Sequence, residues 1–502
     1  MHTDQISCAA MNAPRGGPVV AAVGPGAHYA SGSWPPYRIE HITQPVDHFN
    51  ALTSNATFKQ RYLREDSNFT KGGPIFAFTG GEGGDVPRFY TAYDTPIGFA
   101  RRLGGMIIFM EMRFFGTSDT VNASSSCAGG VEELCPTAGR LGLLSVEQVL
   151  ADYTRLLVDV RRRCGADCAS SSVVTFGGSL AGTLAALMRL RAPWLVDFAY
   201  ASSAPLLGYD GIAGIDQYSW RARVTSNWRE LGSGESCVEV VRRGFRALAL
   251  ANASMVAKTF GVCEGTWGAD VALSIQGIAW GILEGEGTHP YPPKLSQIQG
   301  RCDAMLKAAA AAAAAGGAAA ATADSTDRSD GIDSQAAPQQ PVPADAVPTD
   351  LGIFRALLAW SPSPAPPPPS PPPKCLNLTR HAESRNAVAW DFLACTEVLH
   401  PIGSNNVTDF FPPGPWTVAS TAAFCRQQFA EALTPRPHWL PTQFGLYELA
   451  RFKRAASHIL FTCTPRGKLQ NPHTHHRTLT PMPACETRLE PPCPAVGAES
   501  SS

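Results

Sequence analysis

The chain has 502 residues, of which 44% are hydrophobic and 17% are charged, and its formal net charge is -1. A chain of this length exceeds what one hydrophobic core usually holds, so two or three structural units are expected. The balanced charge argues against a nucleic-acid-binding protein, which would carry a basic stripe. Its apolar stretches fall short of the ~20 residues that span a bilayer, so we expect no membrane span.

The cysteines and the glycosylation motifs bear on the compartment. Fourteen cysteines are many for a cytosolic enzyme and indicate an oxidising compartment. Acceptor sequences for N-glycosylation agree with this, although free thiols with accidental acceptor sequences are the alternative. Residues 1–30 hold only a short apolar patch, so we expect that a secretory signal begins upstream or that the protein is not secreted, and we favour the upstream start. The acceptor sequences begin at Asn55, Asn68, Asn122, Asn252, Asn377 and Asn406.

After an N-terminal extension, residues 1–36, that we expect to be unstructured, residues 37–208 alternate short apolar strands with helical patterns. A helix is predicted from Ser145, a suitable N-cap, to Arg163. This alternation implies a mostly parallel sheet with helices on both faces. The predicted strands are Ile75–Phe78, Met106–Met110 and Val173–Phe176.

The middle of the chain, residues 209–428, has a helical pattern and carries several cysteines. Two low-complexity segments interrupt it, one near 308–345 that begins as an alanine run and one near 361–373 that is rich in proline. We expect both to be surface loops or linkers, because neither composition builds a packed core; a short glycosylated stalk is the alternative for the proline segment. Residues 429–462 are expected to return to the first domain, and residues 463–502 have no hydrophobic periodicity.

The most informative segment is Val173–Gly182, a strand that runs into small residues around Ser179 and then into an apolar helix. Strand, serine between small residues, and helix form the nucleophile elbow of an α/β-hydrolase. The elbow holds its serine in a strained backbone conformation, so the neighbouring residues must be small. The helix also points backbone amides at the place where an oxyanion forms. A Gly/Ser-rich turn before a helix is the structural alternative.

Further motifs occur in order between residues 44 and 462, apart from the two low-complexity segments. They are Val46–Asn50, Thr57–Tyr62, Gly73–Phe76, Thr79–Gly83, Glu111–Gly116, Leu144–Asp152, Ala201–Pro205 and Cys395–Glu397. Together with the elbow, they resemble the lysosomal Pro-X carboxypeptidase and dipeptidyl peptidase II family of serine exopeptidases. The resemblance implies an α/β-hydrolase fold with an inserted helical, cysteine-bearing cap domain. It implies a location in the secretory pathway, the lysosome or vacuole, or outside the cell.

The resemblance also implies roles for residues around the elbow. Ser179 would be the nucleophile, and the backbone amides of Leu180 and Gly81 would form the oxyanion hole. Glu82 would lie near the substrate-binding region, with a solvated loop acid as the alternative. Leu180 stands where the family has a tyrosine, which puts substrate specificity in question more than chemistry.

Two other motifs are read as structural. Asp47 and His48 belong to a motif that precedes the core strands, so we do not assign them to a catalytic triad. Glu111 and Arg113 are expected to pair with each other and to hold the loop after the second predicted strand.

The catalytic acid and base are not identified. In an α/β-hydrolase an aspartate and then a histidine follow the serine. Residues 455–462 resemble the strand before the family's aspartate, but the turn with Asp-Pro-Trp that should follow is absent. His473, His475 and His476 stand in no recognisable context, and with the nearby cysteines they match no zinc spacing, so we predict no metal. We interpret residues 463–502 as translated non-coding sequence.

The cysteines outside this tail fall into local groups, and we expect disulfides mainly inside each group. The connectivity cannot be deduced from the sequence. The groups are Cys127 with Cys135, Cys164 with Cys168, Cys237 with Cys263, and the four residues Cys302, Cys375, Cys395 and Cys425.

The leading hypothesis is a serine exopeptidase that cleaves peptides next to proline through an acyl-enzyme on Ser179. Trimming from the C-terminus and removal of N-terminal dipeptides both stay open. The alternative is a catalytically inactive, truncated relative that acts as a peptide-binding glycoprotein. Neither hypothesis requires a cofactor. The expected partners are peptides with proline near the scissile bond, and a homodimer is consistent with the resemblance.

Overall fold

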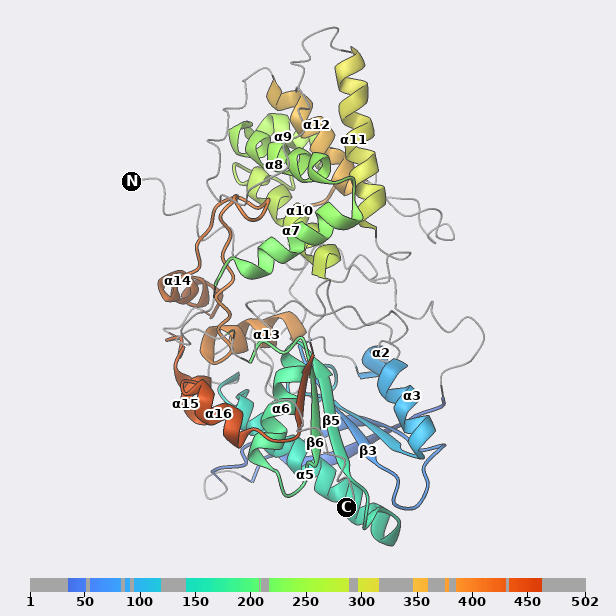
Figure 1. Cartoon of the computed structure of the whole chain (residues 1–502). Coiled ribbons are helices and arrows are strands. Elements are labelled where there is room, and N and C mark those ends of the chain that lie inside the picture. The colour runs from blue at the N-terminus through green and yellow to red at the C-terminus, as the bar shows by residue number, and fades with distance from the viewer. Residues whose placement is uncertain are drawn as a thin grey trace, which may run out of the picture. The chain divides into compact units, whose positions relative to one another are not determined.

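The computed structural model forms two compact units (Figure 1). The first, here called the sheet unit, contains the described residues up to 208 together with 385–400 and 425–462. The second, the helical unit, contains the described residues of 216–378 and 401–424. The structure describes residues 35–50, 55–82, 86–90, 94–118, 141–206, 208, 216–288, 297–315, 346–359, 375–378, 385–429 and 433–462.

Within the described residues, the sheet unit has a seven-stranded sheet in the order β1-β2-β4-β3-β5-β6-β7. The strands from β4 to β7 along this order are parallel, while β1 and β2 pair antiparallel at one edge. The three strands predicted from the sequence are confirmed as β3, β4 and β5. The bounds are β1 Arg38–Pro45, β2 Thr57–Glu65, β3 Ile75–Thr79, β4 Met106–Met110, β5 Val173–Gly178, β6 Phe198–Ser202 and β7 Ile459–Thr462.

Helices cover the sheet on both sides, because β4 and all of β3 except Thr79 are apolar and both strands are buried on both faces. Figure 1 shows α2 and α3 on one side of the sheet and α5 and α6 on the other. The predicted N-cap of α5 is confirmed, since the Ser145 side chain accepts a hydrogen bond of 3.3 Å from the Gln148 amide. The helices of this unit are α2 Val86–Tyr90, α3 Asp94–Leu103, α5 Val146–Cys164, α6 Leu180–Arg191, α13 Arg385–Thr396, α15 Trp439–Phe444 and α16 Leu449–Ala455, with a 3-10 turn at Gly165–Cys168.

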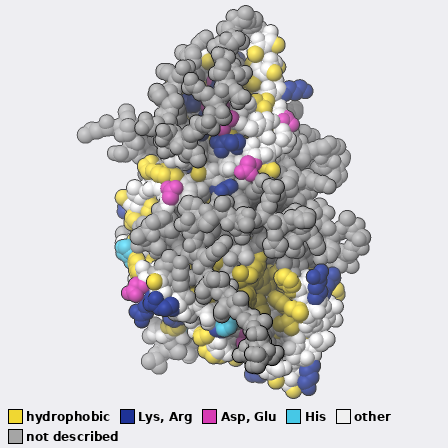
Figure 2. All heavy atoms as spheres, viewed as in Figure 1, with side chains coloured by type: hydrophobic (Ala, Val, Ile, Leu, Met, Phe, Trp, Pro, Cys, Tyr) yellow, Lys and Arg dark blue, Asp and Glu magenta, His cyan; other side chains and the backbone are white. Residues whose placement is uncertain are grey.

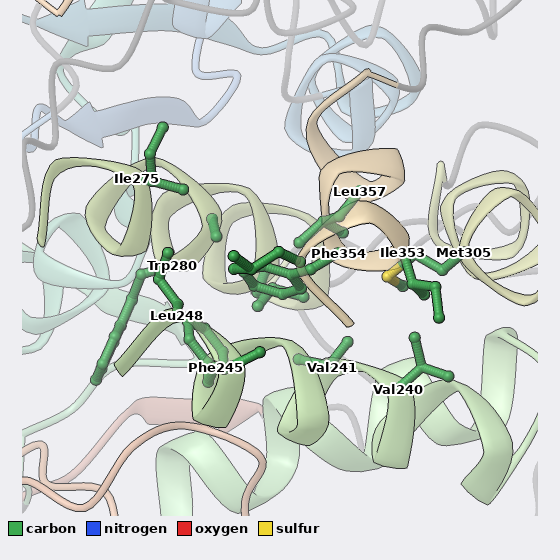
Figure 3. Packing of buried hydrophobic residues seen from close by; sticks show 14 of the residues in the cluster. Val240, Val241, Phe245, Leu248, Ile275, Trp280, Met305, Ile353, Phe354 and Leu357 are labelled. Carbon is green, nitrogen blue, oxygen red and sulfur yellow. The ribbon is translucent and has the colours of Figure 1, made fainter. Parts of the chain in front are cut away.

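The helical unit packs around a core of aromatic and aliphatic side chains (Figure 3). The rings of Phe245 and Phe354 lie 5.1 Å apart between centroids and join α8 to α12. Gly244 allows this approach, because a Cβ there would lie 2.2 Å from the Phe354 ring. The helices are α7 Ser219–Leu231, α8 Glu235–Leu250, α9 Ala253–Phe260, α10 Val271–Thr288, α11 Ile298–Ala315 and α12 Val347–Ala359; α14, Val418–Phe429, begins in this unit.

The alanine run was expected to be a loop, and that expectation is wrong for its first part. Ala308–Ala315 continues α11, whose buried residues Cys302 and Met305 pack into the core of the helical unit. Alanine has the highest helix propensity, so a helix that is anchored by packing extends readily through such a run. The proline-rich segment and residues 316–345 lie outside the described residues.

Helix α13 belongs to a different unit from the one expected. Residues 385–400 were placed in the helical insertion, but they cluster with the sheet unit. The buried carboxylate of Glu397 explains this placement. One oxygen accepts a hydrogen bond of 2.8 Å from the Val146 amide at the start of α5, and the other pairs with Arg436. Glu397 therefore joins α13 to α5 and to the segment that leads back to the sheet.

Burial raises the pKa of Glu397 to about 7, against 4.5 for an unperturbed carboxyl, and the nearby Glu147 acts in the same direction. The folded state thus binds a proton more tightly than the unfolded state, so stability rises as the pH falls through this range. Between pH 7 and pH 5 we expect the free energy of unfolding of the wild type to rise by about 2 kcal/mol relative to Glu397→Gln.

Urea unfolding of both proteins at pH 5, 6 and 7 measures this difference. Glu235→Gln is the control, because the Glu235 side chain is 59% exposed and its loss should leave the wild-type pH dependence intact. Parallel pH profiles for the wild type and Glu397→Gln would contradict the assignment.

Disulfides join described cysteines in both units. The expectation is confirmed for Cys164 with Cys168 and for Cys395 with Cys425. It is wrong for Cys237 and Cys263, which pair with Cys302 and Cys375 from the group of four. The packing of the helical unit explains these pairings. Helix α8, which carries Cys237, lies against α11, which carries Cys302. Val262, the residue before Cys263, forms a β-bridge with Leu376, the residue after Cys375. Cys127 and Cys135 lie outside the described residues. The bridges are Cys164–Cys168, Cys237–Cys302, Cys263–Cys375 and Cys395–Cys425.

None of the helices in the described ranges combines the length and the apolar character needed to cross a membrane. Figure 2 shows basic and acidic side chains in small separate groups on the viewed face. Hydrophobic side chains gather there near α2 and α3, and in α3 Phe99 is 48% exposed and Leu103 is 57% exposed.

Candidate active site

Ser179 lies at the junction of β5 and α6, in the backbone conformation that an elbow requires. Its φ is 59° and its ψ is -131°, a region that residues other than glycine rarely adopt and that costs about 1–3 kcal/mol. Two backbone hydrogen bonds of 3.0 Å hold it there, one from the Ser179 amide to the Ser202 carbonyl and one from the Thr183 amide to the Ser179 carbonyl. The turn is therefore fixed by the neighbouring strand and by the helix that follows.

The small residues around the serine are required by close backbone contacts. A Cβ on Gly177 would lie 2.5 Å from the carbonyl carbon and 2.6 Å from the carbonyl oxygen of Ala181. A Cβ on Gly182 would lie 3.0 Å from the carbonyl oxygens of Gly177 and Ser202. Strand and helix thus approach each other through glycine, and this approach turns the chain sharply at Ser179.

Two buried amides beside the elbow have no acceptor within the described part of the chain: those of Leu180 and Gly81. Leu180 is the first residue of α6, so its N–H has no partner in the helix. Gly81 packs on the first turn of the same helix, with its Cβ position 3.4 Å from the Ala181 nitrogen. Buried N–H groups without acceptors are rare in folded proteins. Such a pair is what an oxyanion hole needs.

The structure brings Glu82 to the serine. The Ser179 hydroxyl donates a hydrogen bond of 3.1 Å to Oε1 of Glu82, which follows the two glycines after β3 and is partly exposed. Among the residues that the structure describes, this is the one side chain hydrogen-bonded to Oγ of Ser179. Glu82 therefore lies one hydrogen bond from Oγ of Ser179.

Comparisons with known proteins show the family to which this chain belongs. Residues 44–313 match the serine carboxypeptidase S28 family. The chain belongs to this family. The lysosomal Pro-X carboxypeptidase of Bos taurus is 30% identical over 423 residues, which cover 82% of this chain and 73% of the relative. The human protein of the same name is 28% identical over 424 residues, with 82% and 74% covered. The S28 chain is thus a serine-type peptidase with an α/β-hydrolase fold and a cysteine-bearing helical unit, as the resemblance implied.

A human thymus-specific serine protease is also similar to this S28 chain. It is 34% identical over 174 residues, which cover 34% of this chain and 30% of that relative.

The loop that carries Gly81 and Glu82 in this S28 protein is held from several directions. The Thr79 hydroxyl donates to the Ala181 carbonyl at 2.5 Å, and the Gly80 amide donates to the Met110 carbonyl at 3.0 Å. The hydroxyl of Tyr153, on α5, donates to the Gly80 carbonyl at 3.1 Å. Sequence reasoning missed Tyr153, because it lies in the apolar stripe of α5 and its pattern is that of a core residue.

A buried ion pair on the same helix connects the two motifs that were read as structural. Both oxygens of Asp152 accept from the Arg113 guanidinium, at 2.7 Å and 3.0 Å, and both side chains are fully buried. Nε2 of His48 lies 2.7 Å from Oδ1 of the same carboxylate. This network connects the loop after β1 and the loop after β4 to α5, and His48 contributes one of its contacts.

The expected pairing of Glu111 with Arg113 is wrong. Glu111 accepts from Nε of Arg61 at 3.2 Å, because it follows directly on β4 and β4 pairs with β2, which carries Arg61. The buried guanidinium of Arg113 is neutralised by Asp152 instead.

The strand β7 ends at Thr462, whose carbonyl accepts from the Ser203 amide at 2.6 Å. The position where the family's aspartate is expected, and the histidines His473, His475 and His476, lie outside the described residues.

Proposed function

We propose that the protein is an exopeptidase that cleaves peptides next to proline, with Ser179 as the nucleophile. The observation that carries this proposal is the strained Ser179 beside two buried amides, those of Leu180 and Gly81, that have no acceptor among the described residues. The preference for proline is supported by the printed names of the Pro-X carboxypeptidases, which align with 82% of this chain.

In the proposed reaction, Oγ of Ser179 attacks the carbonyl carbon of the scissile peptide, and the carbonyl oxygen becomes an oxyanion. The amides of Leu180 and Gly81 donate to this oxygen, where their dipoles stabilise the developing charge without having to reorient. The tetrahedral intermediate collapses to an acyl-enzyme with release of the amine, and water then hydrolyses the ester. Before Oγ attacks, the Ser179 hydroxyl turns from Glu82 to a general base, which takes the hydroxyl proton and then passes it to the leaving amine.

Glu82 also takes part in the proposed reaction. Its carboxylate lies one hydrogen bond from the nucleophile and is partly exposed, so a bound peptide passes within reach of it. We assign Glu82 to substrate binding, where it accepts a hydrogen bond from an N–H group of the peptide and releases the Ser179 hydroxyl.

A pair of blocked peptides tests the activity and its direction. One has a blocked N-terminus and ends in Pro-Phe with a free carboxylate; the other has a free N-terminus and carries a chromogenic amide after its second residue, proline. Cleavage of either peptide supports the proposal, and the one that is cleaved identifies the enzyme as a carboxypeptidase or a dipeptidyl peptidase.

A simple ester such as p-nitrophenyl acetate completes this test. Hydrolysis of the ester without cleavage of either peptide would identify a general esterase and overturn the proline preference. Inertness toward all three substrates would favour the peptide-binding relative that lacks catalysis.

The proposed compartment is the secretory pathway or the lysosome, and it rests on the disulfides, on the names of the relatives and on the glycosylation motifs. Asn55, Asn68, Asn252 and Asn377 are exposed, and Asn406 is partly exposed. Asn122 lies outside the described residues. A mobility shift after glycosidase treatment of the protein from a eukaryotic host tests these sites.

We also propose a homodimer, which rests on the resemblance alone, and light scattering tests it.

A further inference from the structure

Tyr153 is a buried polar group that the reaction above does not use. Its side chain is fully buried in α5, and its hydroxyl donates to the Gly80 carbonyl at 3.1 Å. Burying a hydroxyl is costly unless it forms a hydrogen bond, and a phenylalanine would fill the same space without that cost. Burial also raises the pKa of the Tyr153 hydroxyl well above its usual value, so the group stays a proton donor.

The acceptor of this bond lies in the peptide unit that carries the Gly81 amide. In a planar trans peptide the C=O of one residue and the N–H of the next point in opposite directions. A hydroxyl that fixes the Gly80 oxygen therefore also fixes the direction of the Gly81 N–H, which points away from Tyr153.

The loop needs such a restraint, because Gly80 and Gly81 lack side chains and glycine has the largest backbone freedom. The Gly80 amide is bonded to Met110, and Gly81 touches Ala181 on α6, but neither contact sets the rotation of the peptide unit between the two glycines. The bond from Tyr153 is the contact that does so among the described residues.

We infer that Tyr153 is a positioning residue, which aims the Gly81 amide at the oxyanion of the transition state. This inference rests on the proposed function, in which the Gly81 amide is one of two oxyanion donors. Tyr153 acts through the backbone and does not touch the substrate, so its contribution should appear in kcat and not in KM.

The test compares Tyr153→Phe with Tyr90→Phe. Tyr90 is a matched control: it is fully buried, and its hydroxyl donates to a backbone carbonyl, that of Pro35, at 3.0 Å. For each protein, kcat and KM are measured on p-nitrophenyl acetate and on the peptide that the wild type cleaves, together with Tm and the fraction of sites titrated by a fluorophosphonate.

For Tyr153→Phe we expect kcat to fall about 10- to 100-fold, somewhat less than the loss of a whole oxyanion donor, with KM within about twofold of the wild type. For Tyr90→Phe we expect wild-type kcat and KM and a similar change in Tm, because both variants lose one buried hydroxyl.

Several results would overturn the inference. A wild-type kcat in Tyr153→Phe would leave the hydroxyl with a structural role only. The same holds if the fall in kcat equals the fall in the fraction of sites that the fluorophosphonate titrates. Failure of Tyr153→Phe to fold while Tyr90→Phe folds would have the same meaning. A wild-type protein that hydrolyses neither substrate and is not labelled would instead remove the proposed function itself.

Discussion

Replacement of Ser179 by alanine is expected to reduce kcat by about 10⁴-fold or more, toward the rate that binding and oxyanion stabilisation alone support. The physical reason is that the acyl-enzyme cannot form without Oγ, while the fold is unaffected: the hydrogen bonds that fix residue 179 come from its backbone. Initial rates on the cleaved blocked peptide, measured at equal concentrations of folded protein, give this ratio.

Ser203→Ala is the control for this variant. Ser203 follows β6, and its contact with Thr462 is made by the backbone amide, so its hydroxyl should be dispensable. Residual activity of Ser179→Ala within about tenfold of the wild type would mean that another nucleophile carries the reaction.

Replacement of Asp152 by alanine is expected to lower the free energy of unfolding by about 3–5 kcal/mol. It leaves the fully buried guanidinium of Arg113 without its counter-charge and removes the partner of His48. Removing one member of a buried ion pair is costly, because the remaining charge stays desolvated. Urea unfolding monitored by tryptophan fluorescence measures the change.

Asp159→Ala is a matched control on the same helix. Asp159 pairs with Arg162 and Arg163, whose side chains are 73% and 44% exposed, so its loss should cost at most about 1 kcal/mol. Equal losses in the two variants would show that the buried network around Asp152 does not hold the loops to α5.

Much of the sheet unit could be predicted because its signals are local. The apolar runs that became β3, β4 and β5 are strands buried on both faces, and Ser145 caps α5 as its position before an apolar-periodic segment indicated. The elbow was predictable because close packing of β5 on α6 leaves room only for small residues, above all Gly177.

The predictions that were wrong concern contacts between segments far apart in the chain. Local grouping paired Cys237 with Cys263, whereas helix packing brings Cys237 to Cys302. Likewise, Glu111 and Arg113 are neighbours in sequence, but their partners lie on β2 and α5.

The alanine run and the Tyr153–Gly80 hydrogen bond also depend on tertiary packing that the local sequence does not reveal. The composition of the run does not show that the preceding turns of α11 are anchored in a core. The bond from Tyr153 to Gly80 depends on how α5 crosses the sheet, and no spacing along the chain reveals it.

If this chain holds Ser179 as a reactive nucleophile, a fluorophosphonate should form a covalent adduct with its Oγ. The wild-type protein and Ser179→Ala are incubated with a fluorophosphonate, and the adduct is located by peptide mapping with mass spectrometry. We predict one adduct per chain, on Ser179, and none on the alanine variant. A folded wild-type protein that forms no adduct at Ser179, or that is labelled equally in both forms, would contradict the claim.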